Sequence, residues 1–172
     1  MNAPRYQVGL ISDTHGLLRP QALAALRGSH CIVHAGDIGD PSILGRLSAI
    51  APVTAVRGNN DHGTWANRLP ETARLDVGNI HLFVIHDLAQ LRLDPVTGGI
   101  DVVVAGHSHR PLSERRNGVL YVNPGSAGPR RFKLPVSIAT LCVVDRDVDA
   151  EIVALELERV AAPPERHRGR HP

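Results

Sequence analysis

The sequence predicts an α/β protein, a four-layer α-β-β-α sandwich in which two mixed β-sheets pack together between outer helices. In the first half of the chain, short apolar strand patterns alternate with helical patterns, which is typical of βαβ units and a parallel sheet. In the second half, strand patterns follow one another through short turns, which favours antiparallel pairing. Hydrophobic residues make up 42% and charged residues 21% of the 172 positions, as in folded globular proteins. A chain of this length is expected to form one domain.

The first half supplies three strands and two helices. Buried strands are expected where apolar runs occur, at 6–12 (YQVGLIS), 30–35 (HCIVHA) and 53–57 (VTAVR). The helices between them are expected at Pro20–Arg27 and Pro41–Ile50, because proline fits the first turn of a helix. Asp40, directly before the second helix, is a candidate N-cap.

The second half is expected to be mostly antiparallel. The dipeptides Gly78-Asn79 and Asn117-Gly118 suit tight turns and predict two hairpins, 72–77 with 80–86 and 113–116 with 119–122. A buried strand is expected at 101–105, and a last pair, 136–144 and 148–157, surrounds an acidic turn. The domain is expected to span residues 1–158. Residues 159–172, rich in proline, arginine and histidine without periodicity, are expected to form a disordered tail.

Charge and hydropathy exclude several function classes. Residues 158–172 hold four arginines and two glutamates, so the rest of the chain has 15 bases and 15 acids. A neutral body with 3% aromatic residues argues against a nucleic-acid-binding surface. The sequence has neither a run of about 18 apolar residues, which a membrane span needs, nor the apolar stretch of a signal peptide. We therefore expect a cytoplasmic protein without a membrane partner, and a homo-oligomer stays open.

Polar side chains follow five of the predicted strands, at the point where each strand ends. The carboxyl ends of strands in an open α/β sheet form its crevice, so these groups should meet. The mixture of carboxylate, amide and imidazole groups suits Mn²⁺, Fe²⁺, Zn²⁺ or Co²⁺ better than an all-oxygen calcium site. The set is too large for one tetrahedral zinc and fits two octahedral metals that share a ligand. Its members are Asp13, His15, Asp37, Asn59, His86, His107 and His109.

The motifs DxH, GD, GNxD, a strand-end histidine and GHxH, in this order, resemble those of the calcineurin-like metallophosphoesterases over roughly residues 6–157. LISDTHG, HAGDIGD, GNND and NPGSAGPRR are similar to the small single-domain YfcE-type phosphodiesterases. The resemblance implies that one metal is held by Asp13, His15, Asp37 and His109. It implies that the second is held by Asp37, Asn59, His86 and His107, with Asp37 as the bridging carboxylate.

The resemblance also implies an activity. It points to a phosphodiesterase with two divalent metal ions, in which a metal-bridging hydroxide attacks a small phosphodiester in line with the leaving group. Mn²⁺ is the usual activator of the family, and Ni²⁺, Zn²⁺, Fe²⁺ and Co²⁺ are the other candidates. The expected catalytic residues are Asp37, Asn59, His107 and Asn60, because charge on the phosphoryl oxygens needs stabilisation in the transition state.

Two positions depart from the pattern of the larger family members. Those proteins have GNH, and the histidine helps to protonate the leaving group, whereas this chain has Asn60. An amide hydrogen-bonds a phosphoryl oxygen but delivers no proton at pH 7, which disfavours the alternative of a phosphomonoesterase or protein phosphatase. The strand-end His86 is usually followed by glycine, whereas Asp87 stands here, either at the rim or as a hydrogen-bond acceptor.

Other interpretations stay open beside this one. A non-catalytic scaffold of the same fold, such as the retromer subunit that has lost metal ligands, would not need the complete donor set. A nuclease is disfavoured by the neutral body. Arg130 and Arg131 either face the phosphate of the substrate or are two solvated arginines. His34 and His62 lie next to the motifs and either support the site or are there by coincidence.

Overall fold

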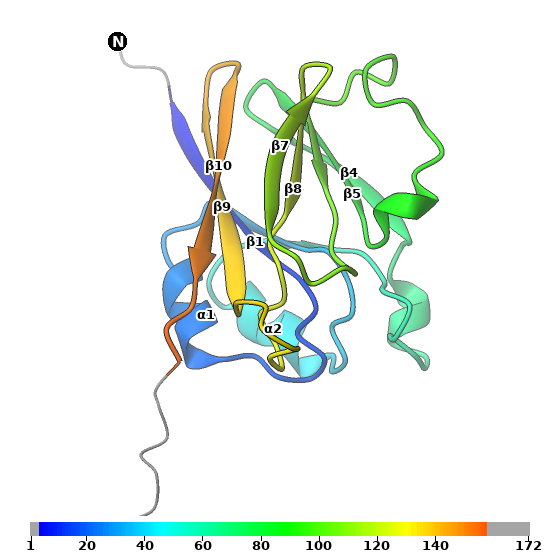
Figure 1. The fold of residues 1–172 in the computed structure, drawn as a ribbon, viewed down its shortest axis with the longest axis vertical. Helices are drawn as coiled ribbons and strands as arrows, with labels where there is room; N and C mark the ends of the chain where they lie inside the picture. The colour runs from blue at the N-terminus through cyan, green and yellow to red at the C-terminus, as the bar shows by residue number, and fades with distance from the viewer. Residues whose placement is uncertain (1–3, 158–172) are drawn as a thin grey trace, which may run out of the picture.

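The computed structural model describes residues 4–157, which form two five-stranded sheets packed on one another (Figure 1). The strand order is β10-β9-β1-β2-β3 in the first sheet and β4-β5-β6-β8-β7 in the second. Each sheet contains both parallel and antiparallel pairs. The predicted sandwich of two mixed sheets is therefore confirmed.

The first sheet contains the βαβ units that the sequence predicts. Its parallel strands are joined by the helices α1 (Pro20–Leu26) and α2 (Ser42–Ser48). The Asp40 carboxylate accepts a hydrogen bond from the Ser42 backbone N–H at 2.7 Å and so caps α2. The strands are β1 (Arg5–Ile11), β2 (Cys31–His34), β3 (Val53–Ala55), β9 (Ser137–Val144) and β10 (Asp147–Ala154).

The second sheet contains both predicted hairpins. At the turn between β7 and β8, Asn117 and Gly118 both have positive φ, 50° and 85°, as the tightest hairpin turns require. The strands β5, β6 and β8 are parallel, and β4 and β7 lie antiparallel at the edges. The strands are β4 (Thr72–Val77), β5 (Ile80–Ile85), β6 (Val102–Val104), β7 (Leu112–Arg116) and β8 (Val119–Asn123).

Three apolar clusters hold the layers together. One lies between the sheets and is built almost entirely from valine, leucine and isoleucine of the facing strands. A second lies between the first sheet and its two helices. The third covers the outer face of the second sheet, where residues 87–100 contribute the 3₁₀ turn η2 (Leu88–Gln90) and loop instead of an α-helix. Pro95 and Gly98-Gly99 explain this difference, because both residue types interrupt helices.

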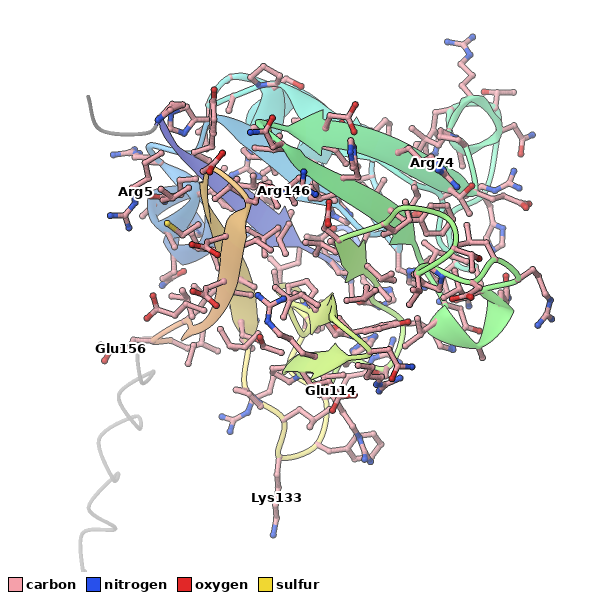
Figure 2. The ribbon with its side chains drawn as sticks, turned by 90° about the horizontal axis from the view of Figure 1, so that it is seen from above. Arg5, Arg74, Glu114, Lys133, Arg146 and Glu156 are labelled. Carbon is pink, nitrogen blue, oxygen red and sulfur yellow. The ribbon has the colours of Figure 1, made fainter. Side chains whose placement is uncertain are left out.

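The surface of the described chain carries mixed charge. The side chains labelled in Figure 2, including Arg5, Glu114, Lys133 and Glu156, point outward from different elements. No helix within residues 4–157 is long and apolar enough to cross a bilayer. The tail expected at 159–172 lies outside the described residues.

Candidate metal centre

The structure brings all seven predicted donor side chains together. They follow the carboxyl ends of β1, β2, β3, β5 and β6, the edge at which the sequence places them. Donor atoms of Asp13, His15 and His109 lie within 4.8 Å of one another, and so do those of Asp13, Asp37 and His86. The remaining two are connected through an amide oxygen: Asn59 Oδ1 lies 3.0 Å from both His86 Nε2 and His107 Nδ1.

The first group of donors converges on a buried carboxylate. His109 Nε2 lies 3.1 Å from Asp13 Oδ1 and 3.2 Å from His15 Nε2. Among the described residues, Asp13 Oδ1 accepts no hydrogen bond although it is buried. Buried polar atoms nearly always have a partner, so a carboxylate oxygen and two imidazole nitrogens in this arrangement fit a bound cation.

Asp37 lies between the two groups. Its Oδ2 is 3.8 Å from His15 Nε2, and its Oδ1 is 3.5 Å from His86 Nε2. Burial raises the pKa of Asp37, but hydrogen bonds from His86 and Asn60 outweigh burial and hold this pKa well below its ordinary value. Asp37 is therefore anionic near neutral pH, in the position expected of a bridging carboxylate.

The ring orientation of His86 is fixed by the main chain. Its Nδ1 donates to the Ala35 carbonyl at 2.7 Å, which leaves Nε2 facing Asn59 and Asp37. Burial lowers the pKa of His86, but the hydrogen bonds to Asp37 and Ala35 raise it above the ordinary value. In the neutral ring, the proton sits on Nδ1 and the lone pair of Nε2 faces the centre, as a metal ligand requires.

Five of the seven donors have left-handed backbone. A positive φ in a non-glycine residue costs on the order of 1 kcal/mol and persists only where the surroundings enforce it. At Asp13, the backbone N–H donates to the Gly36 carbonyl at 3.0 Å. The Ser12 hydroxyl and the His107 backbone N–H donate to Oδ2 of Asp13 at 2.6 and 3.1 Å. The five residues are Asp13 (54°), His15 (46°), Asp37 (55°), His107 (65°) and His109 (58°).

The glycines of GNxD and GHxH allow the loops to approach the carboxylates. A Cβ on Gly58 would lie 2.1 Å from the Asp37 N and Oδ1 atoms, and one on Gly106 would lie 2.0 Å from Ser12 Oγ. Asp61, the acidic residue of GNxD, is buried and accepts the backbone N–H groups of Gly39 and Gly58, each at 2.8 Å. It joins the loops after β2 and β3. Asp61 is assigned no role from the sequence alone, although its position as the acidic residue of GNxD indicates a structural or functional one.

His34 stabilises two of the loops that carry the donor residues. Its side chain is fully buried, and its Nε2 lies 3.0 Å from the Thr14 hydroxyl. That hydroxyl donates to the Ile38 carbonyl, so His34 Nε2 is the donor, and Nδ1 accepts from the Gly36 backbone N–H. The ring is therefore neutral and ties the loop after β1 to the loop after β2.

Because His34 is buried as a neutral ring, we expect the free energy of unfolding to depend on pH. Burial lowers the pKa of His34 from 6.5 to about 4, so its stabilising effect is complete above pH 6.5 and is lost as the pH falls toward 4. Between pH 7 and pH 4.5 this loss amounts to about 2 kcal/mol. We expect urea unfolding of His34→Gln to show a smaller difference between these two pH values than the wild type, by about that amount. An equal difference in both proteins would contradict the assignment.

The other predicted residues lie around this centre. The Asn60 backbone N–H donates to Asp37 Oδ1 at 2.8 Å and its side-chain amide donates to Oδ2 at 2.7 Å, so Asn60 positions this carboxylate. Arg130 and Arg131 are exposed on the loop after β8. The pKa of His15 lies below its ordinary value, chiefly because the ring is partly buried. The carboxylates of Asp37 and Asp13 raise this pKa, and the charge of Arg131 lowers it. Phosphate binding by the two arginines stays a prediction.

Asp87 and His62 also have defined places. The Asp87 carboxylate accepts the Ala89 backbone N–H at 3.0 Å and caps η2, so it serves as an acceptor for the main chain. His62 is exposed and lines a pocket beside the centre.

Comparison with known proteins agrees with this geometry. Residues 6–146 match the calcineurin-like phosphoesterase superfamily domain. The chain is 37% identical over 157 residues to a probable metallophosphoesterase of Methanothermobacter thermautotrophicus, covering 85% of this chain and 91% of that protein. It is 30% identical over 181 residues to the phosphodiesterase YfcE of Escherichia coli, covering 88% and 93%.

A solved structure of the same fold is vacuolar protein sorting 29 from Cryptosporidium parvum, with a TM-score of 0.77 and 20% identity. The alignment covers 88% of this chain and 92% of that one. The sequence match extends over most of the chain, and the donor side chains meet where the motifs of the family place them. The chain therefore belongs to the calcineurin-like phosphoesterase superfamily.

Proposed function

We propose that the protein is a phosphodiesterase that uses two divalent cations, Mn²⁺ first among them, and acts on a small phosphodiester. The observation that carries this proposal is the convergence of seven donor side chains from five strand ends. The 30% identity to a protein named phosphodiesterase YfcE supports the substrate class. Such cations would supply Lewis-acid stabilisation of the phosphoryl group and a water acidic enough to attack phosphorus.

The residues of this chain hold and orient that centre. One cation would be held by Asp13, His15, Asp37 and His109, and the other by Asp37, Asn59, His86 and His107. The low pKa of Asp37 keeps its carboxylate charged, and the hydrogen bonds from Asn60 fix both of its oxygens. The Ala35 carbonyl keeps His86 in the tautomer that a ligand needs.

Asn60 favours a diester over a monoester substrate. Its amide carries no acidic proton at neutral pH and donates to Asp37. The leaving group therefore receives no proton from this position. A diester with a stable leaving alkoxide has the least need for such a proton.

The test is a metal-supplemented comparison of two chromogenic esters. With Mn²⁺, kcat/KM for bis(para-nitrophenyl) phosphate should exceed that for para-nitrophenyl phosphate by about tenfold or more, and turnover should require the added cation. His107→Ala should lower diester turnover by at least about tenfold. His81→Ala, at the exposed start of β5, is the matched control and should turn over like the wild type.

Two outcomes would contradict the proposal. Equal turnover of both esters would leave a phosphomonoesterase as the better description. If neither ester is cleaved with Mn²⁺, Ni²⁺, Zn²⁺, Fe²⁺ or Co²⁺, the non-catalytic scaffold would be favoured.

A further inference from the structure

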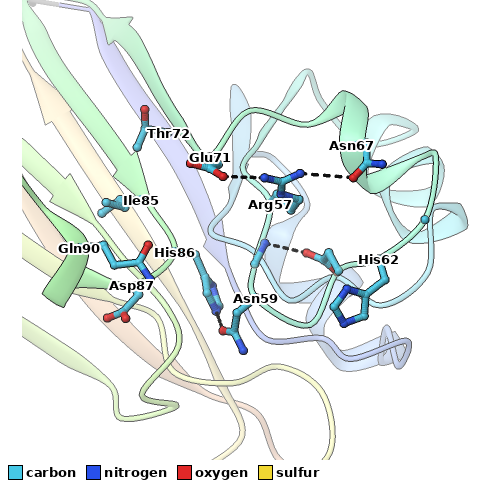
Figure 3. A pocket seen from close by; sticks show the side chains of 13 residues that line it. Arg57, Asn59, His62, Asn67, Glu71, Thr72, Ile85, His86, Asp87 and Gln90 are labelled. Atoms are coloured by element: carbon cyan, nitrogen blue, oxygen red, sulfur yellow. Dashed lines mark hydrogen bonds and ion pairs between the residues drawn. The ribbon is translucent and has the colours of Figure 1, made fainter.

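A polar pocket with a volume of about 480 Å³ opens directly beside the metal centre (Figure 3). Asn59 and His86 line it, so the pocket borders two of the donor side chains. Its other walls come from the segment between β3 and β4 and from the end of β5 through η2. The polar side chains of these walls include Arg57, Asn67, Glu71, Asp87 and Gln90.

The one arginine that lines the pocket is already neutralised. Arg57 Nη2 lies 2.6 Å from Glu71 Oε1, and Arg57 Nη1 donates to Asn67 Oδ1 at 3.4 Å, as Figure 3 shows. The carboxylates of Asp61 and Asp87 line the same pocket. Carboxylates thus outnumber the single cation, so a second phosphate or another anionic group would be repelled. Each carboxylate already accepts from a backbone N–H or from Arg57, so none is left unpaired to hold an ammonium group.

Several hydrogen-bonding groups of the pocket remain free. Within residues 4–157, the Gln90 amide, the second carboxylate oxygen of Glu71 and the Asn67 amino group have no protein partner. Together they offer donors and acceptors on opposite walls of the same pocket (Figure 3), which suits several hydroxyl groups because a hydroxyl both donates and accepts. The residues that line the pocket include no Phe, Tyr or Trp on which a nucleobase would stack.

We propose that this pocket binds an uncharged polyhydroxyl alcohol, such as glycerol or a sugar, as one ester group of the phosphodiester substrate. The inference rests on the proposed phosphodiesterase function and names its substrate class. The phosphoryl group lies at the donor side chains, and the hydroxyl groups contact Arg57, Glu71 and Gln90.

The first experiment compares para-nitrophenyl phosphodiesters that differ only in their second alcohol: methyl, glyceryl or aminoethyl. With Mn²⁺, kcat/KM for the glyceryl diester should exceed that for the methyl diester by about tenfold, the gain from one or two net hydrogen bonds. The aminoethyl diester should be no better than the methyl diester. A glyceryl diester no better than methyl, or an aminoethyl diester that is best, would overturn the pocket assignment while the proposed function stands.

The second experiment tests which side chains cause the preference for the glyceryl diester over the methyl diester. Gln90→Met removes both hydrogen-bonding atoms at similar length, and Glu71→Gln removes the acceptor charge. Each should lower the ratio of glyceryl to methyl turnover to about threefold or less. Glu114→Gln breaks the exposed ion pair with Arg116 on β7 and should keep the wild-type ratio. A wild-type ratio in both pocket variants would overturn the proposal.

A binding measurement separates the two proposals. Calorimetric titration of the Mn²⁺-loaded protein with glycerol phosphate and with methyl phosphate reports the same preference without turnover, again about tenfold. Preferential binding of glycerol phosphate without cleavage of any diester would refute the proposed function and keep the pocket. Equal binding of both phosphates would overturn the pocket assignment.

Discussion

Asp37→Asn is expected to lower diester turnover by about 10³-fold, comparable to the largest losses for a single charge-stabilising group. Asp37 has oxygens within 4 Å of imidazole nitrogens in both donor groups, those of His15 and His86. The amide removes the negative charge. It also turns an N–H group either toward Asn60, which already donates, or toward the donor nitrogens. The measurements are kcat/KM with saturating Mn²⁺ and the metal content of the purified protein.

Asp40→Asn is the matched control for this variant. Asp40 lies three residues further along the same loop, is exposed and caps α2. Asparagine caps a helix about as well as aspartate, so stability and turnover should stay close to the wild type. If Asp37→Asn kept near-normal turnover while His109→Ala did not, the bridging role of Asp37 would be wrong.

Asn60→His is expected to raise turnover of diesters with poor leaving groups by about 10²-fold, the low end for a positioned general acid. The wild type has no proton to offer at this position, so its rate should fall steeply as the pKa of the leaving alcohol rises. An imidazole supplies that proton near neutral pH and should flatten the dependence. The measurement is the slope of log kcat/KM against leaving-group pKa, with aryl and alkyl diesters.

Asn60→Ala separates proton donation from the positioning of Asp37. Alanine removes the 2.7 Å hydrogen bond from the side-chain amide to Asp37 Oδ2. It should lower turnover of all the diesters alike and keep the steep slope of the wild type. Equal slopes in all three proteins would mean that the acid lies elsewhere, with the exposed His62 as the next candidate.

Much of this fold is predictable because its signals are local. Apolar runs mark the buried strands, and the Gly78-Asn79 and Asn117-Gly118 dipeptides mark two hairpins. The meeting of the donor residues follows from one topological rule, that strand ends of an open sheet share an edge. The placement of β9 between β1 and β10 depends on contacts between residues far apart in the chain, so no local pattern indicates it.

The supporting contacts of the site escaped prediction for a related reason. Asn60 looks like a rim residue in sequence, yet it holds Asp37 because Gly58 allows its loop to come within van der Waals distance of that carboxylate. The Asp61 contacts to two glycine N–H groups depend on the same approach. Such contacts are set by how two loops fit together.

The left-handed backbone at five donor residues limits how this centre can be built into another β-sandwich protein. The direction of each Cα–Cβ bond is set by φ and ψ, so the same seven side chains on relaxed loops would point elsewhere. A designer would have to copy main-chain angles, the Ser12 and Asp61 hydrogen bonds, and the glycines that let the loops touch. The unit that can be moved between scaffolds is a set of interlocked loops, and the ligand list alone is not enough to specify it.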